Sequence, residues 1–190
     1  MSFQDRIKQA SKFEKELFST IEEMGFVVAV NGTEHTHPEF VSGLKKSEDQ
    51  TSLAIRFQPD GVASIGNISR SFYVEAKASK TIERTAYEQY KKLFTVENIV
   101  VIVFEPFDWK WCFVEEMPLE DGHDTVAPFP AERRFPVSDD GWLYPRKSRH
   151  GIAKGSGTPY RKIKPEELRK WETFKKEIIE RLAENMHIPA

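Results

Sequence analysis

The first 24 residues carry apolar side chains at the period of an α-helix. These residues fall three or four positions apart, at Phe3, Ile7, Ala10, Phe13, Leu17, Ile21 and Met24. This spacing gathers them on one face of a helix, which Gly25 ends. Glu14 lies about 40° from the centre of that face. Its carboxylate therefore either reaches into an interior site or turns out to water or to a lysine.

Short runs of β-branched and aromatic residues predict a series of strands. They cover residues 26–30, 53–57, 62–65, 72–77, 98–104 and 109–114. Gly66-Asn67, with Ser69 and Ser71, supplies turn chemistry between the third and fourth of these strands. Residues 98–104 form an almost unbroken apolar run, which predicts a central strand that is buried on both faces. Residues 109–114 alternate less cleanly, which indicates an adjacent or edge strand.

Two more helices complete the pattern. Residues 81–94 carry a buried face, and Gln89 lies at its margin, either bonded to a site or on an ordinary helix flank. Pro165 opens a final helix, because proline is favoured at the first helical position. Its apolar face either packs on the sheet, which we favour, or forms the seam of a homodimer. Helices interspersed with strands predict an α/β fold with a central mixed sheet flanked by helices and a C-terminal helix.

Length and composition fit one domain over residues 1–190, with a core over about 1–115 and a basic loop and C-terminal helix over about 142–186. The net charge is −2, so global charge does not indicate a nucleic-acid partner, although local patches still can. Cys112 is the only cysteine, which excludes an intramolecular disulfide and a cysteine-cluster metal site. The N-terminus lacks the apolar segment of a signal peptide, and no apolar run has the length of a membrane span. We therefore expect a cytoplasmic protein without a membrane partner.

The most informative feature is an aspartate at the start of one strand and an acid–lysine pair at the end of the next. Fourteen residues separate Asp60 from Glu75, enough for a strand, a turn and a return strand. Glu75 and Lys77 share one strand face, and Ala76 points to the other. Two carboxylates suit Mg²⁺, which lowers the pKa of a bound water and neutralises charge on a phosphate. Lysine can orient that water or stabilise developing charge. The competing interpretation is a surface hairpin with scattered charges.

Pro59-Asp60 followed by Glu75-Ala76-Lys77 resembles the motif of the PD-(D/E)xK nuclease superfamily. Residues 13–26, FEKELFSTIEEMGF, resemble the opening helix of Holliday junction resolvase-type nucleases, and Glu88-Gln89-Tyr90 resembles the helix that follows the motif. The resemblance covers about residues 1–115 and implies a restriction-endonuclease-like core. It also implies that Asp60, Glu75 and the Ala76 carbonyl hold Mg²⁺ or Mn²⁺, and that Glu14 and Gln89 join Asp60, Glu75 and Lys77 as catalytic residues.

A basic, glycine-rich segment with aromatic neighbours follows the predicted core. Between residues 146 and 164 there are seven basic residues and no acid. Such a segment suits a phosphate backbone, although charge runs are also common on solvated surfaces. The candidate nucleic-acid-binding residues are Arg146, Lys147, Arg149, Lys154, Arg161 and Lys162.

These features together predict a Mg²⁺-dependent deoxyribonuclease, with endonuclease activity favoured over exonuclease activity. The alternative on the same fold is a nucleic-acid-binding protein without catalysis. If the motif is accidental, Asp60, Glu75 and Lys77 should not converge in space. The sequence contains no recognition helix for a base sequence, and only the opening helix hints at branched DNA as the substrate.

Overall fold

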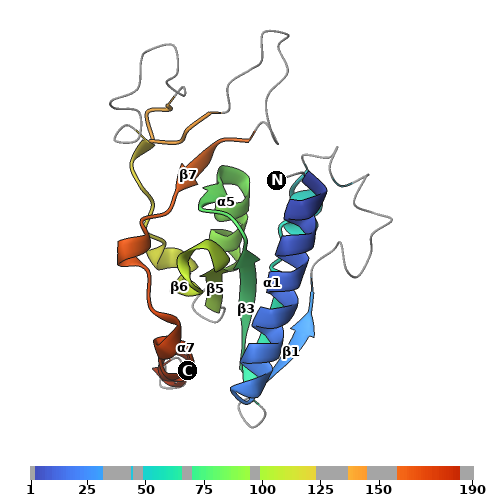
Figure 1. The fold of residues 1–190 in the computed structure, drawn as a ribbon. Coiled ribbons are helices and arrows are strands. Elements are labelled where there is room, and N and C mark those ends of the chain that lie inside the picture. Colours follow the sequence, from blue (N-terminus) through green and yellow to red (C-terminus); the bar gives the residue numbers. More distant parts are fainter. Residues whose placement is uncertain are drawn as a thin grey trace, which may run out of the picture.

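The computed structural model describes residues 3–31, 44, 49–65, 70–94, 99–122, 137–144 and 158–184, and Figure 1 traces their arrangement. The α-helices are α1 (Phe3–Glu23), α4 (Gln50–Arg56), α5 (Arg84–Leu93) and α7 (Phe174–Glu184). The strands are β1 (Phe26–Val30), β2 (Gly61–Ile65), β3 (Ser71–Lys77), β4 (Thr81–Glu83), β5 (Ile99–Phe104), β6 (Lys110–Phe113) and β7 (Tyr160–Lys162). Short 3₁₀ turns are η2 (Glu105–Phe107), η3 (Val114–Glu116), η5 (Pro165–Glu167) and η6 (Trp171–Thr173).

A five-stranded mixed sheet in the order β1-β2-β3-β5-β6 forms the centre of the molecule. β1, β2 and β3 pair antiparallel, β3 and β5 pair parallel, and β6 returns antiparallel to β5. Parallel strands need a crossover connection, and α5 lies in the one between β3 and β5. β4 and β7 form a separate two-stranded sheet. The predicted fold class, a mixed central sheet with flanking helices and a C-terminal helix, is confirmed.

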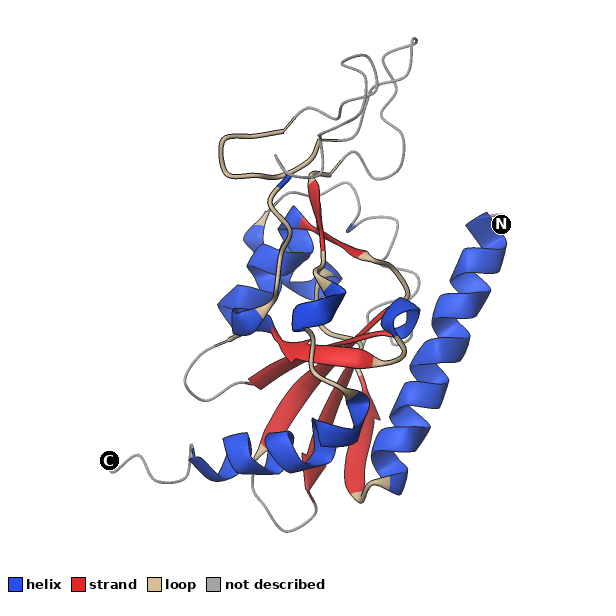
Figure 2. Cartoon of the chain, turned by 60° about the vertical axis from the view of Figure 1, so that its left-hand side comes forward, coloured by secondary structure: helices blue, strands red, loops and turns tan. Residues whose placement is uncertain are grey.

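Each face of the central sheet carries its own hydrophobic core, as the helices on both sides of the strands in Figure 2 illustrate. On one face, α1 and α7 pack through residues such as Leu17 and Phe174 against Phe72 and Val74 of β3. On the other face, α5 packs against alternate residues of β5, and Trp142 belongs to the same cluster. The C-terminal helix therefore packs on the sheet, as the favoured interpretation expected.

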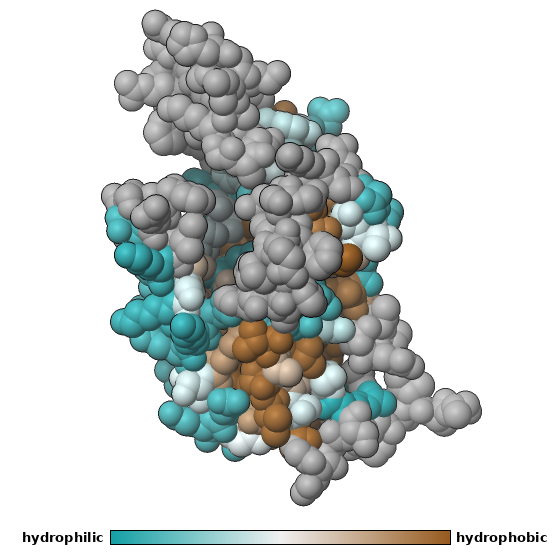
Figure 3. Space-filling view, turned by 90° about the vertical axis from the view of Figure 1, so that its right-hand side faces the viewer, coloured by the Kyte–Doolittle hydropathy of each residue, from teal (hydrophilic) through white to brown (hydrophobic). Residues whose placement is uncertain are grey.

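The predicted strands over residues 98–104 and 109–114 correspond to β5 and β6. Every residue of β5 is buried, as its apolar run predicted, because both of its faces are covered by helices. β6 lies at one edge of the sheet and β1 at the other. Val27 and Val30 of β1 are exposed, and hydrophobic side chains gather at the surface on this side of the molecule in Figure 3. In the described part of the chain, no helix is long and apolar enough to span a bilayer.

The strand predicted over residues 53–57 is wrong, because residues 53–56 belong to helix α4 and Phe57 is its C-terminal cap residue. The Asp49 side chain caps α4 by accepting a hydrogen bond of 2.9 Å from the Ser52 backbone N–H. A capping acid of this kind satisfies a backbone donor that an isolated helix start leaves unpaired. The apolar residues 53–55 had indicated a strand, but no residue of α4 is buried, and none of the strands in the described part of the chain pairs with it.

The predicted helix over residues 81–94 starts three residues later than expected. Residues 81–83 form β4 because their backbone pairs with β7, and two bonds extend this pairing on either side. The Arg84 N–H donates to Pro159 O at 2.7 Å, and the Ile163 N–H donates to Lys80 O at 3.2 Å. Strand β7, about 80 residues away in the chain, thus pairs with the backbone N–H and C=O groups that the first turn of a longer α5 would have used.

The final helix begins at Phe174, not at Pro165. Between them, Arg169 exchanges two backbone hydrogen bonds of 2.9 and 3.0 Å with Trp111 of β6, which keeps the chain extended there. Pro165 instead opens the short turn η5. The apolar residues of this region still face the core, but in separate turns.

Candidate active site

The hairpin of β2 and β3 brings Asp60 next to Glu75. Gly61 at the start of β2 pairs with Val74 of β3. Asp60, one residue before Gly61, therefore comes opposite Glu75, one residue after Val74. The turn residues 66–69 lie outside the described part of the chain. Two contacts fix the backbone before β2: the Asn31 N–H donates to Asp60 O at 2.8 Å, and the Asn31 side-chain amide lies 3.5 Å from Pro59 O.

Glu75 and Lys77 point to the α5 face of the sheet, and Ala76 packs into the opposite core. Lys77 Nζ donates to Glu75 Oε1 at 2.5 Å. The Ala76 N–H donates to Asp60 Oδ2 at 2.8 Å. The three consecutive residues of the motif therefore make direct contacts that tie both carboxylates and the lysine to one end of β3.

A cavity of about 380 Å³ opens at this end of the sheet. Its charged lining residues come from four elements or their flanks: Arg56 of α4, Asp60 before β2, Glu75 and Lys77 of β3, and Glu83 of β4. The remaining lining residues are Phe57, Gln58, Ser79, Thr81, Ala86 and Tyr90. Because the lining comes from separate segments, the cavity exists only in the folded chain.

Burial and like charge act together on Asp60. Burial raises the pKa of its carboxyl well above its usual range, and the nearby Glu75 carboxylate raises it further. The Lys77 ammonium and the Ala76 N–H act in the opposite direction, but they do not overcome these effects. A carboxylate in this position is unstable without more positive charge, which is the condition that a bound cation relieves.

Lys77 is held as a cation. Burial lowers the pKa of its ammonium group, but Glu75 and Asp60 outweigh burial, so the net shift is upward. Its Nζ also lies 5.5 Å from the centre of the Tyr90 ring of α5, within cation–π range. These contacts place a protonated lysine beside the two carboxylates.

The two further candidates from the helices occupy different places. Glu14 of α1 is half-buried and approaches from the other face of the sheet; its charge contributes to the raised pKa of Asp60. Gln89 of α5 is buried, at 7% exposure, and lies outside the lining of the cavity. Of these two candidates, only Glu14 therefore shows an electrostatic link to the cavity.

The donor set fits a hard divalent cation. Within the described ranges, no group of three or more His, Cys, Asp and Glu side chains forms a metal cluster. Mg²⁺ usually takes only one or two carboxylates and keeps several waters. Asp60 and Glu75 supply two carboxylates, and the raised pKa of Asp60 marks a place where positive charge is favourable.

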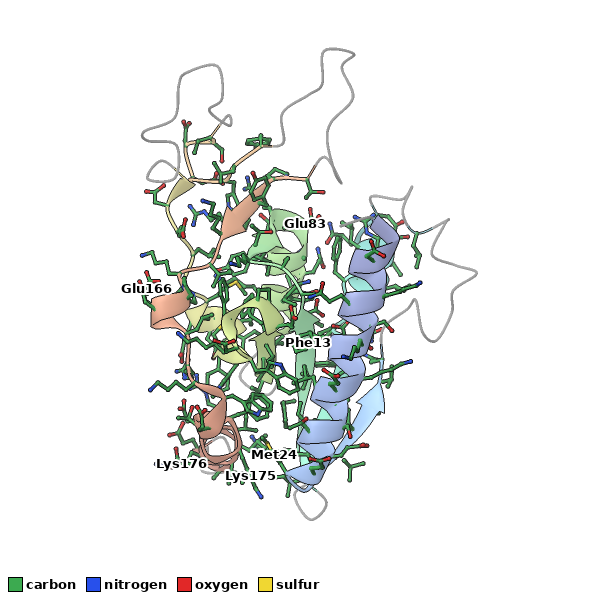
Figure 4. All side chains as sticks on the ribbon, viewed as in Figure 1. Phe13, Met24, Glu83, Glu166, Lys175 and Lys176 are labelled. Carbon is green, nitrogen blue, oxygen red and sulfur yellow. The ribbon has the colours of Figure 1, made fainter. Side chains whose placement is uncertain are left out.

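Three residues at this site were missed in the sequence interpretation. Glu83 lines the cavity at the β4–α5 junction, where Figure 4 labels it, and its charge helps to raise the pKa of Lys77. Arg56 lines the cavity from α4. Gly61 allows a close approach of α1, because a Cβ there would lie 2.7 Å from the Phe18 ring. A glycine directly after Pro59-Asp60 was a visible signal; Glu83 and Arg56 had none.

Only two of the six candidate nucleic-acid-binding residues are described. Arg146, Lys147, Arg149 and Lys154 lie outside the described residues. The Arg161 side chain donates to the backbone carbonyls of Asp140 and Gly141 and lies over the Trp142 ring, so it has a structural role. Lys162 is exposed on β7.

Comparison with known proteins gives a limited result. No family model and no curated protein matches the chain. Among solved structures, the chain is similar to Hjc, a Holliday junction resolvase from the archaeal hyperthermophile Archaeoglobus fulgidus. The sequences are 20% identical, the TM-score is 0.35, and the match covers 59% of this chain and 76% of that chain. A match at this level of identity and TM-score does not indicate an activity. Any activity has to be argued from the residues of the cavity.

Proposed function

We propose that the protein is a divalent-metal-dependent deoxyribonuclease. The observation that supports it most directly is the convergence of Asp60, Glu75 and Lys77 on one cavity at the end of β3. An accidental motif would have left these three side chains on different surfaces. The resemblance of the motif to the PD-(D/E)xK superfamily agrees with this function.

Each side chain has a distinct role in this proposal. Asp60 and Glu75, with the Ala76 carbonyl, would hold Mg²⁺ or Mn²⁺. A metal ion held there would make a water more acidic and offset charge on the phosphate. Lys77, held by Glu75 and Tyr90, orients the attacking water or stabilises negative charge that develops on the phosphate. Glu14 adjusts the electrostatic environment of Asp60 from the far side.

The DNA path runs over the β4–β7 sheet. Lys162 pairs with Thr81, a lining residue of the cavity, and directly paired residues in an antiparallel ladder share a face. In this proposal, the exposed Lys162 shares a face with the cavity-lining Thr81 and binds a phosphate there. Arg146, Lys147, Arg149 and Lys154, which precede β7 in the chain, remain candidates for DNA contact, and Arg161 contributes by holding the loop of Asp140 and Gly141 in place.

The test is cleavage of covalently closed circular DNA, which has no ends. We expect cleavage with Mg²⁺ or Mn²⁺ and none in chelator, because the enzyme is proposed to cut within a strand. Cleavage of linear but not circular DNA would replace the endonuclease by an exonuclease. Linear, nicked, forked and four-way substrates in the same assay would rank the preferred DNA structure.

Matched variants connect any cleavage to the cavity. Asp60→Ala should lose most activity, whereas Glu166→Ala, which removes an exposed carboxylate of η5 (Figure 4), should retain it. Wild-type cleavage by Asp60→Ala would assign the activity to another site. Metal-dependent DNA binding without cleavage on any substrate would favour the alternative, a binding protein on the same fold.

A further inference from the structure

The exposed side of helix α1 is divided by charge along its length. Lys8, Lys12 and Lys15 are exposed and lie within about 60° of one another around the helix axis, opposite the apolar face that packs on the sheet. These three residues form the lysine face of α1. The last turn of the helix contains the exposed Glu22 and Glu23 and no basic residue. Because the helix dipole favours cations in a last turn, helix stability does not explain this arrangement.

The lysine face lies at the cavity end of the central sheet. The Gln9 side chain donates a hydrogen bond of 3.0 Å to Glu105, which directly follows the residue of β5 that pairs with Lys77. The acidic last turn of α1 leads instead into Phe26, which pairs with Ile65 at the opposite end of β2. The cations of α1 are therefore near the cavity and its last-turn acids are far from it, as the course of α1 in Figure 1 shows.

A chain of contacts connects α1 with the β4–β7 sheet around this end. The turn η2, which binds Gln9 through its first residue, ends at Phe107, and the Lys80 Nζ lies 5.8 Å from the centre of the Phe107 ring. Lys80 is exposed and stands between two lining residues of the cavity, Ser79 and Thr81. Thr81 in turn pairs with the exposed Lys162. Exposed lysines from both faces of the sheet thus follow its cavity end.

The dimensions and surroundings of the lysine face fit an extended polyanion. Lys8 and Lys15 are about 10.5 Å apart along the helix axis, and one strand of duplex DNA carries a charge about every 3.4 Å, so the face spans about three phosphates. Asp5 and Glu16 border it, and the exposed Lys12–Glu16 pair of 3.4 Å is weak enough for a phosphate to compete with it. A helix that binds a membrane surface buries its apolar side in the lipid, but that side of α1 is packed on the sheet.

We propose that Lys8, Lys12 and Lys15 bind the phosphate backbone of duplex DNA, so that the DNA follows the end of the sheet from α1 to β7. This inference rests on the proposed function and adds a binding surface outside both the motif and the basic segment. Glu22 and Glu23 repel phosphates from the other end of α1, which keeps the backbone near the cavity.

The test compares two double variants that remove the same charge at opposite ends of the molecule. Lys12→Gln/Lys15→Gln changes the lysine face. Lys175→Gln/Lys176→Gln changes α7, which lies at the end away from Glu83 in Figure 4. The two variants are closely matched, because Lys12 and Lys176 each pair with a glutamate four residues later and each has a side chain that is 77% exposed.

Fluorescence anisotropy with a labelled duplex in Ca²⁺, over a range of salt concentrations, measures binding without cleavage. We expect the α1 double variant to bind about 30-fold more weakly than wild type at about 0.15 M salt. The slope of log K against log salt should fall by about 1.8, because each phosphate contact contributes about 0.9. The α7 double variant should match wild type. Equal binding of the α1 variant and wild type, or equal losses in the two variants, would overturn the proposal.

A tethered cleavage reagent locates the DNA independently of affinity. An iron–EDTA group attached to Lys15→Cys should cut the bound duplex at a few neighbouring nucleotides, whereas the same group on Lys176→Cys should not cut it. The native Cys112 is buried and should not take up the reagent. If anisotropy shows a complex but the group on Lys15→Cys makes no cuts, the DNA does not pass α1 and the proposal fails.

The outcomes separate this proposal from the nuclease function. Wild-type protein that cuts DNA, with an α1 double variant that binds equally well, keeps the nuclease and overturns the role of the lysine face. Wild-type protein that binds DNA through the lysine face but never cuts it keeps the binding surface and overturns the nuclease. Wild-type protein that binds no DNA overturns both.

Discussion

Two clusters of charged side chains lie on opposite faces of the central sheet, and they are built in different ways. The cavity cluster contains Asp60, Glu75, Lys77 and Glu83, on the α5 side. The arm cluster joins the C-terminal segment to β6 and η3, on the α7 side, and contains Glu115, Glu116, Arg169, Glu177 and Arg181.

In the arm cluster, acids and bases are interleaved. Arg169 bonds both Glu116 and Glu177, the latter at 2.7 Å, and Arg181 bonds Glu115 and Glu116 at 2.8 and 2.9 Å. Both guanidinium groups also lie over the Phe113 ring, at 5.0 and 4.7 Å. The two arginines of the arm cluster therefore pack on Phe113 and also pair with glutamates. These contacts hold the C-terminal segment against the edge strand β6.

The two clusters differ most in how neighbours affect a partly buried acid. Burial raises the pKa of Glu115; a backbone hydrogen bond and the Arg181 guanidinium act in the opposite direction, and the net shift stays upward. Burial also raises the pKa of Asp60, but there the next largest influence, Glu75, raises it further. In the arm cluster, cations therefore offset part of the cost of a partly buried acid, whereas at Asp60 a second carboxylate adds to that cost.

The largest expected effect is on catalysis. Replacing Lys77 by Met in the cavity cluster should lower kcat for DNA cleavage by about 10²–10³-fold, since one preorganised positive charge is lost at the reacting phosphate. The control is Lys175→Met on α7 (Figure 4), which should keep wild-type kcat. Equal kcat values for the two variants would show that Lys77 of the cavity cluster has no special part in cleavage.

The next effect is on stability. Arg169→Met in the arm cluster should lower the free energy of unfolding by about 2 kcal/mol, because hydrogen bonds to two carboxylates are lost and the 29% exposure of Arg169 limits their strength. For a chain of this size the melting temperature should fall by about 4–8 °C. Lys176→Met, which breaks an exposed pair at 3.8 Å with Glu180, should change stability by less than about 0.5 kcal/mol. An Arg169 variant that is as stable as the Lys176 variant would contradict this assignment.

A smaller effect should follow the pH in the cavity cluster. A raised pKa in the folded protein means that protonated Asp60 favours folding. Its stabilising contribution is complete below the unfolded pKa of about 3.9 and is lost as pH rises through the folded pKa. In chelator, Asp60→Asn should therefore gain stability relative to wild type as pH rises. Urea unfolding at several pH values measures this, and a difference independent of pH would show that Asp60 is not destabilised.

The smallest effect concerns Cys112 of β6. Burial raises the pKa of its thiol to about 12, so the thiolate fraction at pH 8 is on the order of 10⁻⁴. A thiol reagent should react slowly with the native protein and faster with Arg169→Met. The substitution removes the side-chain bonds of Arg169 to Glu116 and Glu177 and so loosens the segment whose backbone pairs with Trp111, next to Cys112. Asp60→Asn should leave this rate unchanged. Fast labelling of wild-type protein would mean that the pairing between Arg169 and Trp111 of β6 opens readily and exposes Cys112.

Local pattern was sufficient for those features that depend on neighbours in the chain. Alternation along β3 placed Glu75 and Lys77 on one face and Ala76 on the other, and the apolar run of β5 predicted its burial. The length of the segment between Asp60 and Glu75 predicted the hairpin that joins them. Each of these inferences needed only the period of a strand and the reach of a turn.

Other features depended on partners far away in the chain. The apolar residues 53–55 suit a strand or a helix, and the Asp49 cap, without any sheet partner, decided for a helix. β4 exists because β7 pairs with it, and the final helix starts late because Trp111 holds Arg169 extended. Arg56 and Glu83 enter the cavity through the same long-range packing. A single sequence encodes such pairings only through the whole fold, since backbone groups and charges take whichever partner the folded chain brings within reach.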